Sequence, residues 1–237
     1  MTQEPRWPAI FTGLTLAAVL VLLLSGPLTR GGILPWQLGM GGFAIAALLA
    51  GIGAVALLVA VLRRRGGTLM RVALVAGLIG FGVPAFVVAK ASGAPPIHDI
   101  TTDFENPPAF AVITPELRGP GSNPVSYDAE IVPLQQAAFP LVRPVTLALP
   151  PGEAFARAQD AARNMGWEIV DANALTLSIE ATDTSAWWGF KDDVVIRLTP
   201  VADGTRVDVR SKSRVGKGDM GANAKRVMLY LQMVASA

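Results

Sequence analysis

The acidic residues of this chain are distributed very unevenly. Only Glu4 lies within residues 1–90, whereas residues 91–237 contain the other 17 of the 18 Asp and Glu residues. The acid-poor part also contains three long apolar stretches, at about residues 8–28, 38–62 and 69–89. Each is close to the roughly 20 apolar residues that a helix needs to cross about 30 Å of hydrocarbon. The chain is therefore predicted to be an integral membrane protein with one water-soluble domain.

The basic residues beside these stretches predict an orientation. The second loop carries Arg63–Arg65 with Arg71 close behind, whereas Arg30 lies in the first loop and Lys90 follows the third stretch. Loops rich in Lys and Arg stay in the cytoplasm. We therefore expect a retained first span, a cytoplasmic amino terminus and, in the inner membrane of a Gram-negative bacterium, a periplasmic C-terminal domain. The arginine triplet could instead be a lipid or partner site.

The second stretch carries small residues four apart, namely Gly42, Ala46, Ala50 and Ala54. Such a row lets helix backbones approach closely, either within the three-helix unit or against another membrane protein. No ionisable residue lies deep within a stretch. Pumps and proton relays usually need one, so a transport function is disfavoured.

The soluble part begins after a linker at residues 91–96. Residues 97–143, called the wrap below, contain seven prolines and no sustained periodicity. Proline removes a backbone donor and fixes φ, so long helices and central strands are disfavoured there. Because apolar residues such as Phe104 and Phe110 recur in the wrap, we expect it to cover a core formed by residues 144–237.

Residues 144–237 show the alternation of an α+β fold with the order strand, helix, four strands, helix. The expected elements are a strand at 145–149, a helix at 153–165 stopped by Gly166, strands at 167–171, 175–182, 194–198 and 207–209, and a helix from about 220. Asp203-Gly204 favours a hairpin between the last two strands. Short turns predict an antiparallel meander, with the two helices covering its apolar face.

Three separated phrases in this part resemble a known family. They are IHDITTD with NPPAF (97–110), WGFKDDV (188–194), and DVRSKSRV with DMGANA (208–224). In this order they are similar to domain-of-unknown-function family 1499, over residues 97–237, and the preceding spans resemble the membrane region of some bacterial members. Other members carry a cysteine-containing phrase near the start of the domain, which this chain lacks. The resemblance supports the domain boundaries and implies no activity.

An aromatic turn is the most unusual local feature. Trp187, Trp188 and Phe190 are expected at the tip of a hairpin, where turns are normally polar. They are candidates for contact with a membrane or a partner protein. The alternative is that they fold back over one end of the core.

A second candidate is a polar or anion site made by Arg197, Arg210, Arg214, Lys217 and Asn223. Arg206, Asp208 and Arg210 share one face of their strand. The alternative for that face is a solvated surface with cross-strand ion pairs. Asp219 is expected to cap the last helix, where its carboxylate would repel an anion.

A third candidate is a metal or polar cluster of His98, Asp99, Asp103 and Glu105, although its spacing matches no metal loop. Asp192 and Asp193 should point to opposite faces of a strand, and Asp183 could approach Asp193 across the hairpin. The chain has no cysteine, no P-loop and no nucleophile elbow. We therefore assign no catalytic residue, metal or cofactor.

These features favour a non-enzymatic membrane-anchored envelope protein that binds a protein partner or scaffolds an assembly. The alternative is a lipid- or amphiphile-binding domain, because a curved sheet gripped by a helix can enclose an apolar cavity. A hydrolase is the third reading. Residues 91–237 contain 13 Lys and Arg against 17 acids. That balance disfavours a nucleic-acid partner.

Overall fold

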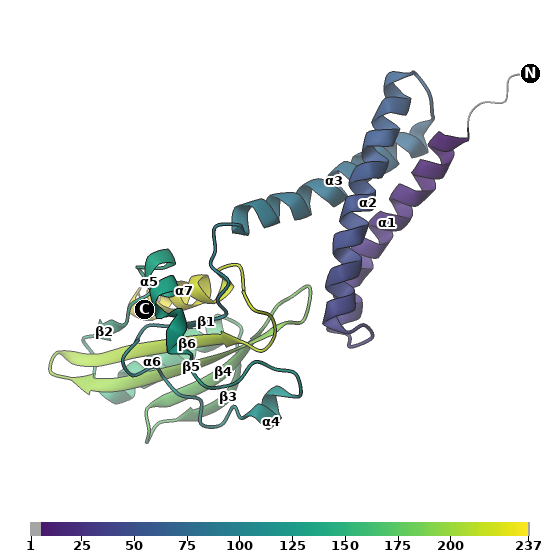
Figure 1. The fold of residues 1–237 in the computed structure, drawn as a ribbon. Helices are drawn as coiled ribbons and strands as arrows, with labels where there is room; N and C mark the ends of the chain where they lie inside the picture. The colour runs from purple at the N-terminus through teal and green to yellow at the C-terminus, as the bar shows by residue number, and fades with distance from the viewer. Residues whose placement is uncertain (1–5, 237) are drawn as a thin grey trace, which may run out of the picture. The chain divides into compact units, whose positions relative to one another are not determined.

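The computed structural model describes residues 6–236, which divide into two compact units (Figure 1). The first unit runs as far as Ser92 and includes the turn Ala186–Gly189, and the second comprises Gly93–Ser185 and the residues from Phe190 onwards. The first unit contains α1 (Trp7–Arg30), α2 (Trp36–Leu62) and α3 (Thr68–Ala91). All three helices are long and apolar enough to cross a membrane, which confirms the prediction of three long apolar helices.

Small residues allow the three long helices to pack closely. Ala46, Ala50 and Ala54 of α2 are buried in the bundle, as the first interpretation of the small-residue row predicted. A Cβ added at Gly53 would collide with the Thr15 side chain of α1, whereas one at Gly42 would meet open space. Hydroxyl groups on α1 are satisfied locally, since Thr15 donates to the carbonyl four residues earlier at 2.7 Å.

The second unit is built on a six-stranded sheet. The strands β3–β6 form the predicted antiparallel meander, and β1 and β2 pair with successive parts of the outer edge of β6. The strands are β1 (Asp99–Thr101), β2 (Val145–Leu147), β3 (Glu168–Asn173), β4 (Ser178–Thr184), β5 (Lys191–Val201) and β6 (Gly204–Ser213). Together with the helices they confirm the α+β class; β1, contributed by the wrap, was not anticipated.

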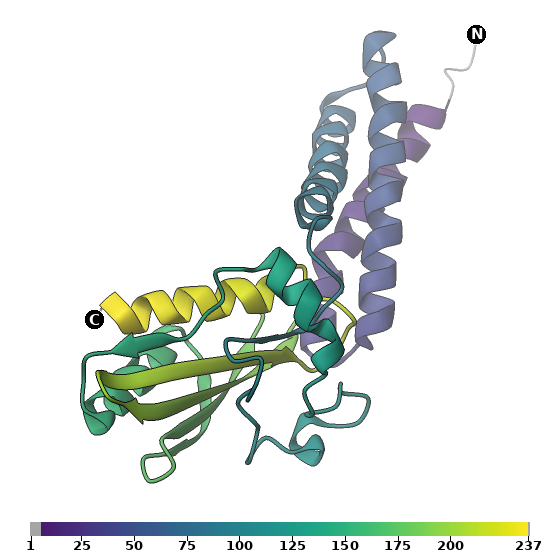
Figure 2. The same ribbon diagram turned by 60° about the vertical axis from the view of Figure 1, so that its left-hand side comes forward.

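Two helices cover one face of the sheet, here called the helix face (Figure 2). They are α6 (Pro151–Asn164) and α7 (Ala222–Ser236). Gly166 follows α6 with φ +78°, as expected for a residue that stops a helix. Trp167 and Tyr230 stack with ring centroids 5.1 Å apart, and the Tyr230 hydroxyl donates to the Ala158 carbonyl at 2.9 Å. Both rings thus belong to the apolar core that the sheet forms with its helices.

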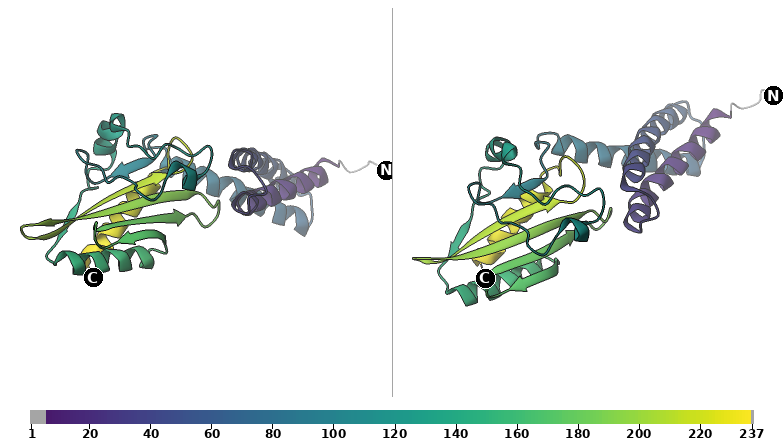
Figure 3. Two further views of the ribbon diagram at one scale, coloured as in Figure 1. Left: turned by 90° about the horizontal axis from the view of Figure 1, so that it is seen from below. Right: turned by 60° about the horizontal axis from the view of Figure 1, so that its bottom comes forward.

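The wrap covers the opposite face of the sheet, here called the wrap face (Figure 3). It contains β1 and three short helices, α4 (Pro115–Arg118), η1 (Ala129–Ile131) and α5 (Val132–Ala138). Gln135 of α5 bonds both the amide and the carbonyl of Thr101 in β1. Polar contacts of this kind replace the long helices that proline excludes.

One expected turn lies elsewhere in the structure. The chain was predicted to turn at 171–174 and to resume a strand at Leu175, but β3 continues to Asn173 and the turn occupies residues 174–177. The Asn173 side chain accepts hydrogen bonds from the amides of Leu175 and Thr176, which closes the turn there. Leu175, expected on a half-buried strand, is 97% exposed.

Candidate functional site

Strand residues alternate between the two faces of the sheet. Charged residues at alternate positions along β5 and β6 therefore share the wrap face. Register pairs Asp193 with Lys212, Val195 with Arg210, and Arg197 with Asp208. The sequence was compatible with a solvated face that carries cross-strand ion pairs. The structure contradicts the solvated part, since Asp193, Asp208 and Arg210 are at most 2% exposed beneath the wrap. The cross-strand pair between Arg197 and Asp208 is present at 3.1 Å.

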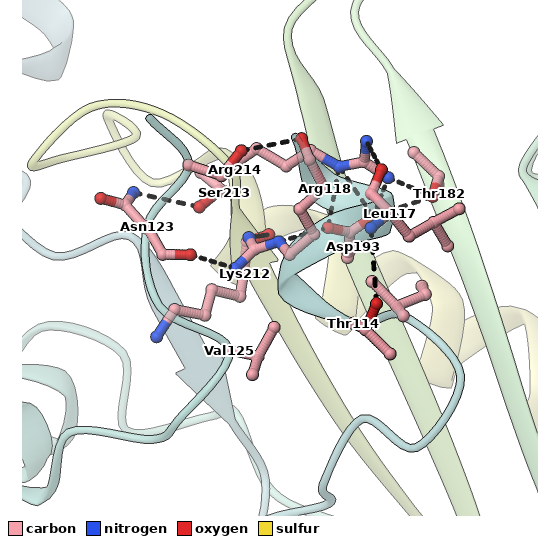
Figure 4. Close-up of polar contacts among 12 residues, drawn as sticks. Thr114, Leu117, Arg118, Asn123, Val125, Thr182, Asp193, Lys212, Ser213 and Arg214 are labelled. Carbon is pink, nitrogen blue, oxygen red and sulfur yellow. Dashed lines mark hydrogen bonds and ion pairs between the residues drawn. The ribbon is translucent and has the colours of Figure 1, made fainter. Parts of the chain in front are cut away.

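Asp193 lies at the centre of one buried cluster (Figure 4). Arg118 of α4 meets it through Nε at 2.8 Å, and Arg214 meets it through Nη2 at 2.8 Å. The Thr182 hydroxyl donates to the same carboxylate at 2.8 Å. The side chains of Arg118 and Asp193 are fully buried, and burial lowers the pKa of Arg118 while Asp193 opposes that shift. This cluster ties the wrap to β5.

Asp99 organises a second buried cluster. It accepts two hydrogen bonds from Arg210, at 2.9 and 2.8 Å, and forms an ion pair with Lys212 at 2.9 Å. The Arg210 guanidinium also lies 5.3 Å from the Phe110 ring and 5.2 Å from the Tyr127 ring. Burial lowers the pKa of Lys212, opposed by Asp99, and burial together with Asp99 raises the pKa of Tyr127 to about 12.

A third cluster joins Asp103 and Asp208 through two arginines. Arg197 reaches Asp103 at 2.9 Å and Asp208 at 3.1 Å, and Arg206 reaches them at 3.2 and 2.9 Å. Burial alone would raise the pKa of Asp103. The amide of Asn106 and the two guanidinium groups outweigh burial and hold that pKa below its usual value.

Glu180 is held by backbone groups instead of cations. Its carboxylate accepts hydrogen bonds from three successive wrap amides, those of Ala111, Val112 and Ile113, at 2.6, 3.0 and 2.7 Å. Glu180 is only 2% exposed. All these carboxylates are engaged by cations or by backbone amides. These contacts hold the wrap against the sheet.

An apolar groove lies on the surface of the same unit, between α7 and residues 141–145. Its volume is about 480 Å³. Leu141 is 80% exposed and Leu229 is 44% exposed, so large apolar side chains face solvent here. The residues that line the groove are Leu141, Arg143, Val145, Lys225, Met228, Leu229, Leu231, Gln232 and Ala235. The charged residues in this set, Arg143 and Lys225, are both basic.

Comparison with known families identifies the sheet domain. The model of the family described as "Protein of unknown function (DUF1499)" matches residues 99–233, more than half of the chain. The chain belongs to the DUF1499 family. This confirms the resemblance seen in the sequence. Comparison with curated proteins gives no match. The DUF1499 match spans β1 and most of the wrap, so the family domain includes the segment that covers the wrap face.

Four of the five residues proposed as an anion site are divided between the two faces of the DUF1499 sheet, and the fifth lies in a loop. Arg197, Arg210 and Arg214 lie on the wrap face, each paired with an aspartate. Asn223 is fully buried at the start of α7 on the helix face, and Lys217 is exposed in the loop before α7. Asp219 accepts hydrogen bonds from Gly221 and Asn223, in the capping role expected of it.

The four residues proposed as a metal or polar cluster are likewise separated by their partners. Asp99 and Asp103 bind different arginines, Glu105 is exposed, and His98 contacts the Lys217 carbonyl at 3.3 Å. Within residues 6–236, no three His, Asp or Glu side chains come together as metal ligands would. The sequence left open an approach of Asp183 to Asp193, but Asp183 lies opposite Asp192, because the strand register pairs Thr182 with Asp193.

The aromatic residues occupy the turn between β4 and β5, as the sequence predicted. Phe190 closes the turn, since its carbonyl accepts from the Ser185 amide at 2.8 Å and its amide donates to the Ser185 hydroxyl at 2.9 Å. Trp187 is 45% exposed. Trp188 belongs to the three-residue turn itself.

Several residues of the DUF1499 domain have contacts or exposure that the sequence did not predict. Arg118 lies 75 positions before Asp193, and no local pattern links them. Arg226 of α7 binds both Asp183 and Asp192 on the helix face, at 2.8 and 2.6 Å. The exposed Leu229 was overlooked because helical periodicity identified only the buried side of α7.

Proposed function

We propose that this protein is a non-enzymatic membrane-anchored module whose DUF1499 domain binds a protein partner in the bacterial periplasm. The three long apolar helices would hold it in the inner membrane, with the amino terminus in the cytoplasm. The observation that carries the proposal is the groove between α7 and residues 141–145, which exposes Leu141 and Leu229 on a soluble domain.

The chemistry of the groove defines the partner segment. Its floor is apolar, and Arg143 and Lys225 are its charged lining residues. A complementary segment would insert an apolar side chain and place acidic residues beside it. We therefore commit to a partner protein that presents an apolar residue flanked by Asp or Glu.

Lipid binding inside the domain is the less favoured reading. A helix-gripped sheet needs free space between the sheet and its helices to hold an acyl chain. Here Trp167 stacks on Tyr230 within the core, and both side chains are buried. Binding at the surface groove needs no such cavity.

Site-specific photo-crosslinking in native membranes tests the proposal. A benzoylphenylalanine replaces Leu229 in the full-length chain, and the control replaces Leu175, which is apolar and 97% exposed but stands outside the groove. We expect Leu229 alone to yield one protein adduct. Mass spectrometry of the adduct should place acidic residues beside the crosslinked position.

Charge reversal supplies the matched controls. Arg143→Glu with Lys225→Glu should abolish the adduct, whereas Arg163→Glu with Lys191→Glu, which reverses two exposed cations outside the groove, should retain it. A lipid adduct at Leu229 would overturn the partner proposal in favour of lipid binding. Equal labelling from Leu175 and Leu229 would also reject it.

The orientation has its own test, because the chain contains no cysteine of its own. Leu175→Cys should react with a membrane-impermeant maleimide once the outer membrane is permeabilised. Gly67→Cys in the α2–α3 loop should react only after the inner membrane is opened. The opposite pattern would place the DUF1499 domain in the cytoplasm.

A further inference from the structure

One end of the three-helix bundle is strongly basic. The start of α1, the end of α2 and the start of α3 all lie at this end (Figure 1). It carries five exposed arginines, Arg6, Arg63, Arg64, Arg65 and Arg71. The opposite end carries only two cations, Arg30 and Lys90. The basic end therefore has a high local charge where the apolar helices stop.

These five arginines are not neutralised within the described part of the chain. No Asp or Glu lies between Glu4 and Asp99. Among residues 6–236, the ion pairs of the structure involve none of the five. Arginine ion pairs do form elsewhere in the same chain, beneath the wrap, so among the described residues the basic end differs in forming none.

The way α2 ends makes Arg64 unusual. The Arg65 amide bonds the Ala60 carbonyl and the Arg64 amide bonds the Val61 carbonyl, which is a Schellman motif. The motif places Arg64 in the left-handed region with φ +56°. The same motif ends α1 and α6, and there the left-handed position is taken by Gly32 and Gly166. Arg64 thus carries a steric cost that glycine avoids.

Arginine suits one ligand chemistry at this place. Its planar guanidinium donates two parallel hydrogen bonds to a phosphate, which a lysine ammonium does not. The positive-inside rule, which sets the orientation of membrane helices, depends only on positive charge, so lysine would satisfy it as well as arginine. All five cations at this end are arginine. The ends of apolar helices also lie at the depth of lipid headgroups.

We propose that this end of the bundle binds the phosphate groups of anionic phospholipids through Arg63, Arg64 and Arg65, with Arg6 and Arg71 adding to the local charge. The site lies in the first unit and is independent of partner binding by the DUF1499 domain. Its ligand is the headgroup of a lipid in the adjacent leaflet, held at the surface of α1–α3 as these helices cross the membrane.

Native mass spectrometry of the full-length chain tests this proposal. The protein in neutral detergent is titrated with phosphatidylglycerol, or with phosphatidylcholine of the same acyl chains. We expect preferential retention of phosphatidylglycerol, weakened by added salt. Each arginine removed from the triplet should weaken binding about fivefold.

The key variant is Arg64→Gly, because it removes the guanidinium and also relieves the left-handed backbone. We expect weaker phosphatidylglycerol binding without a lower melting temperature in neutral detergent. A matched pair of double variants follows: Arg63→Gln with Arg65→Gln should lose affinity, and Arg30→Gln with Lys90→Gln at the other end should not.

Four results would overturn the proposal. Equal retention of the two lipids would remove the headgroup preference, and equal losses in the two double variants would reduce the effect to overall charge. Competition by inorganic phosphate at the same concentration as the lipid would indicate a site for free anions. If Arg64→Gly lowers the melting temperature and leaves lipid binding unchanged, Arg64 serves the helix end instead.

Discussion

The two faces of the DUF1499 sheet are closed by different chemistry, although the same strands build both. On the helix face, Val194, Ile196 and Val209 pack against α6 and α7. On the wrap face, the neighbouring Asp193 and Arg210 meet charged and polar groups of residues 97–143. Apolar packing spreads its stabilisation over many weak contacts. Ion pairs concentrate the stabilisation in a few directional contacts. A single substitution on the wrap face should therefore lower stability far more than one on the helix face.

The largest effect is expected at Asp193. Asp193→Ala leaves the fully buried Arg118 without its carboxylate, and an uncompensated buried charge costs about 3–5 kcal/mol. Hydrogen exchange of β5 and β6 peptides in the full-length protein measures this loss. A loss below about 1 kcal/mol would mean that the wrap face is closed mainly by packing, as the helix face is.

A double variant separates charge burial from loss of shape. Arg118→Met combined with Asp193→Leu removes both buried charges and retains apolar volume. We expect most of the stability lost in either single variant to return, because replacing a buried ion pair by apolar residues is often nearly neutral. If the losses simply add, the pair itself does not account for the effect.

A smaller effect is expected on the helix face. Tyr230→Phe keeps the ring that stacks on Trp167 and removes only the hydroxyl that donates to the Ala158 carbonyl. The loss of one buried hydrogen bond should cost about 1 kcal/mol. The same exchange experiment, read on peptides of α6 and α7, checks it. A cost as large as that of Asp193→Ala would erase the proposed contrast between the faces.

Acid should weaken the wrap face before the helix face. The pKa of Asp103 is lower in the folded protein than its ordinary value of 3.8, so the unfolded chain binds its proton more readily. The stability from this group is therefore fully present above about pH 4 and is lost as pH falls through the folded-state pKa. Protection of wrap peptides, corrected for the intrinsic exchange rate at each pH, should fall less steeply between pH 5 and pH 3 in Asp103→Asn than in the natural chain. Equal slopes would exclude Asp103 as a source of the acid sensitivity.

The smallest effect is expected for an ion pair outside both faces. Arg163 and Asp160 on α6 lie 3.0 Å apart, but their side chains are 56% and 69% exposed. Arg163→Ala should change stability by less than about 0.5 kcal/mol, because exposed pairs are screened by water and salt. Thermal unfolding of the full-length chain is sufficient to measure it. A change of several kcal/mol would show that burial is not what distinguishes the wrap-face pairs.

Some features were determined by sequence alone, because their signals are local. The length of the apolar stretches predicted α1–α3, and strict alternation with Asp203-Gly204 predicted the β5–β6 hairpin. Gly166 marked the end of α6 through its freedom to adopt positive φ. In each case the deciding interactions join residues that are close in the chain, or join a residue to its solvent. Composition and hydrophobic periodicity were therefore sufficient to predict these elements.

Only the tertiary structure decided whether the charged side chains are buried and which partners they bind. Arg210 was predicted to share a strand face with Asp208, and it does, but its partner Asp99 lies 111 positions away and its covering ring Phe110 is also in the wrap. A proline-rich segment carries no periodic signal that says which sheet face it covers. The charges alternate as they would on a solvated strand, and only the covering segment converts that surface into a buried, ion-paired interior.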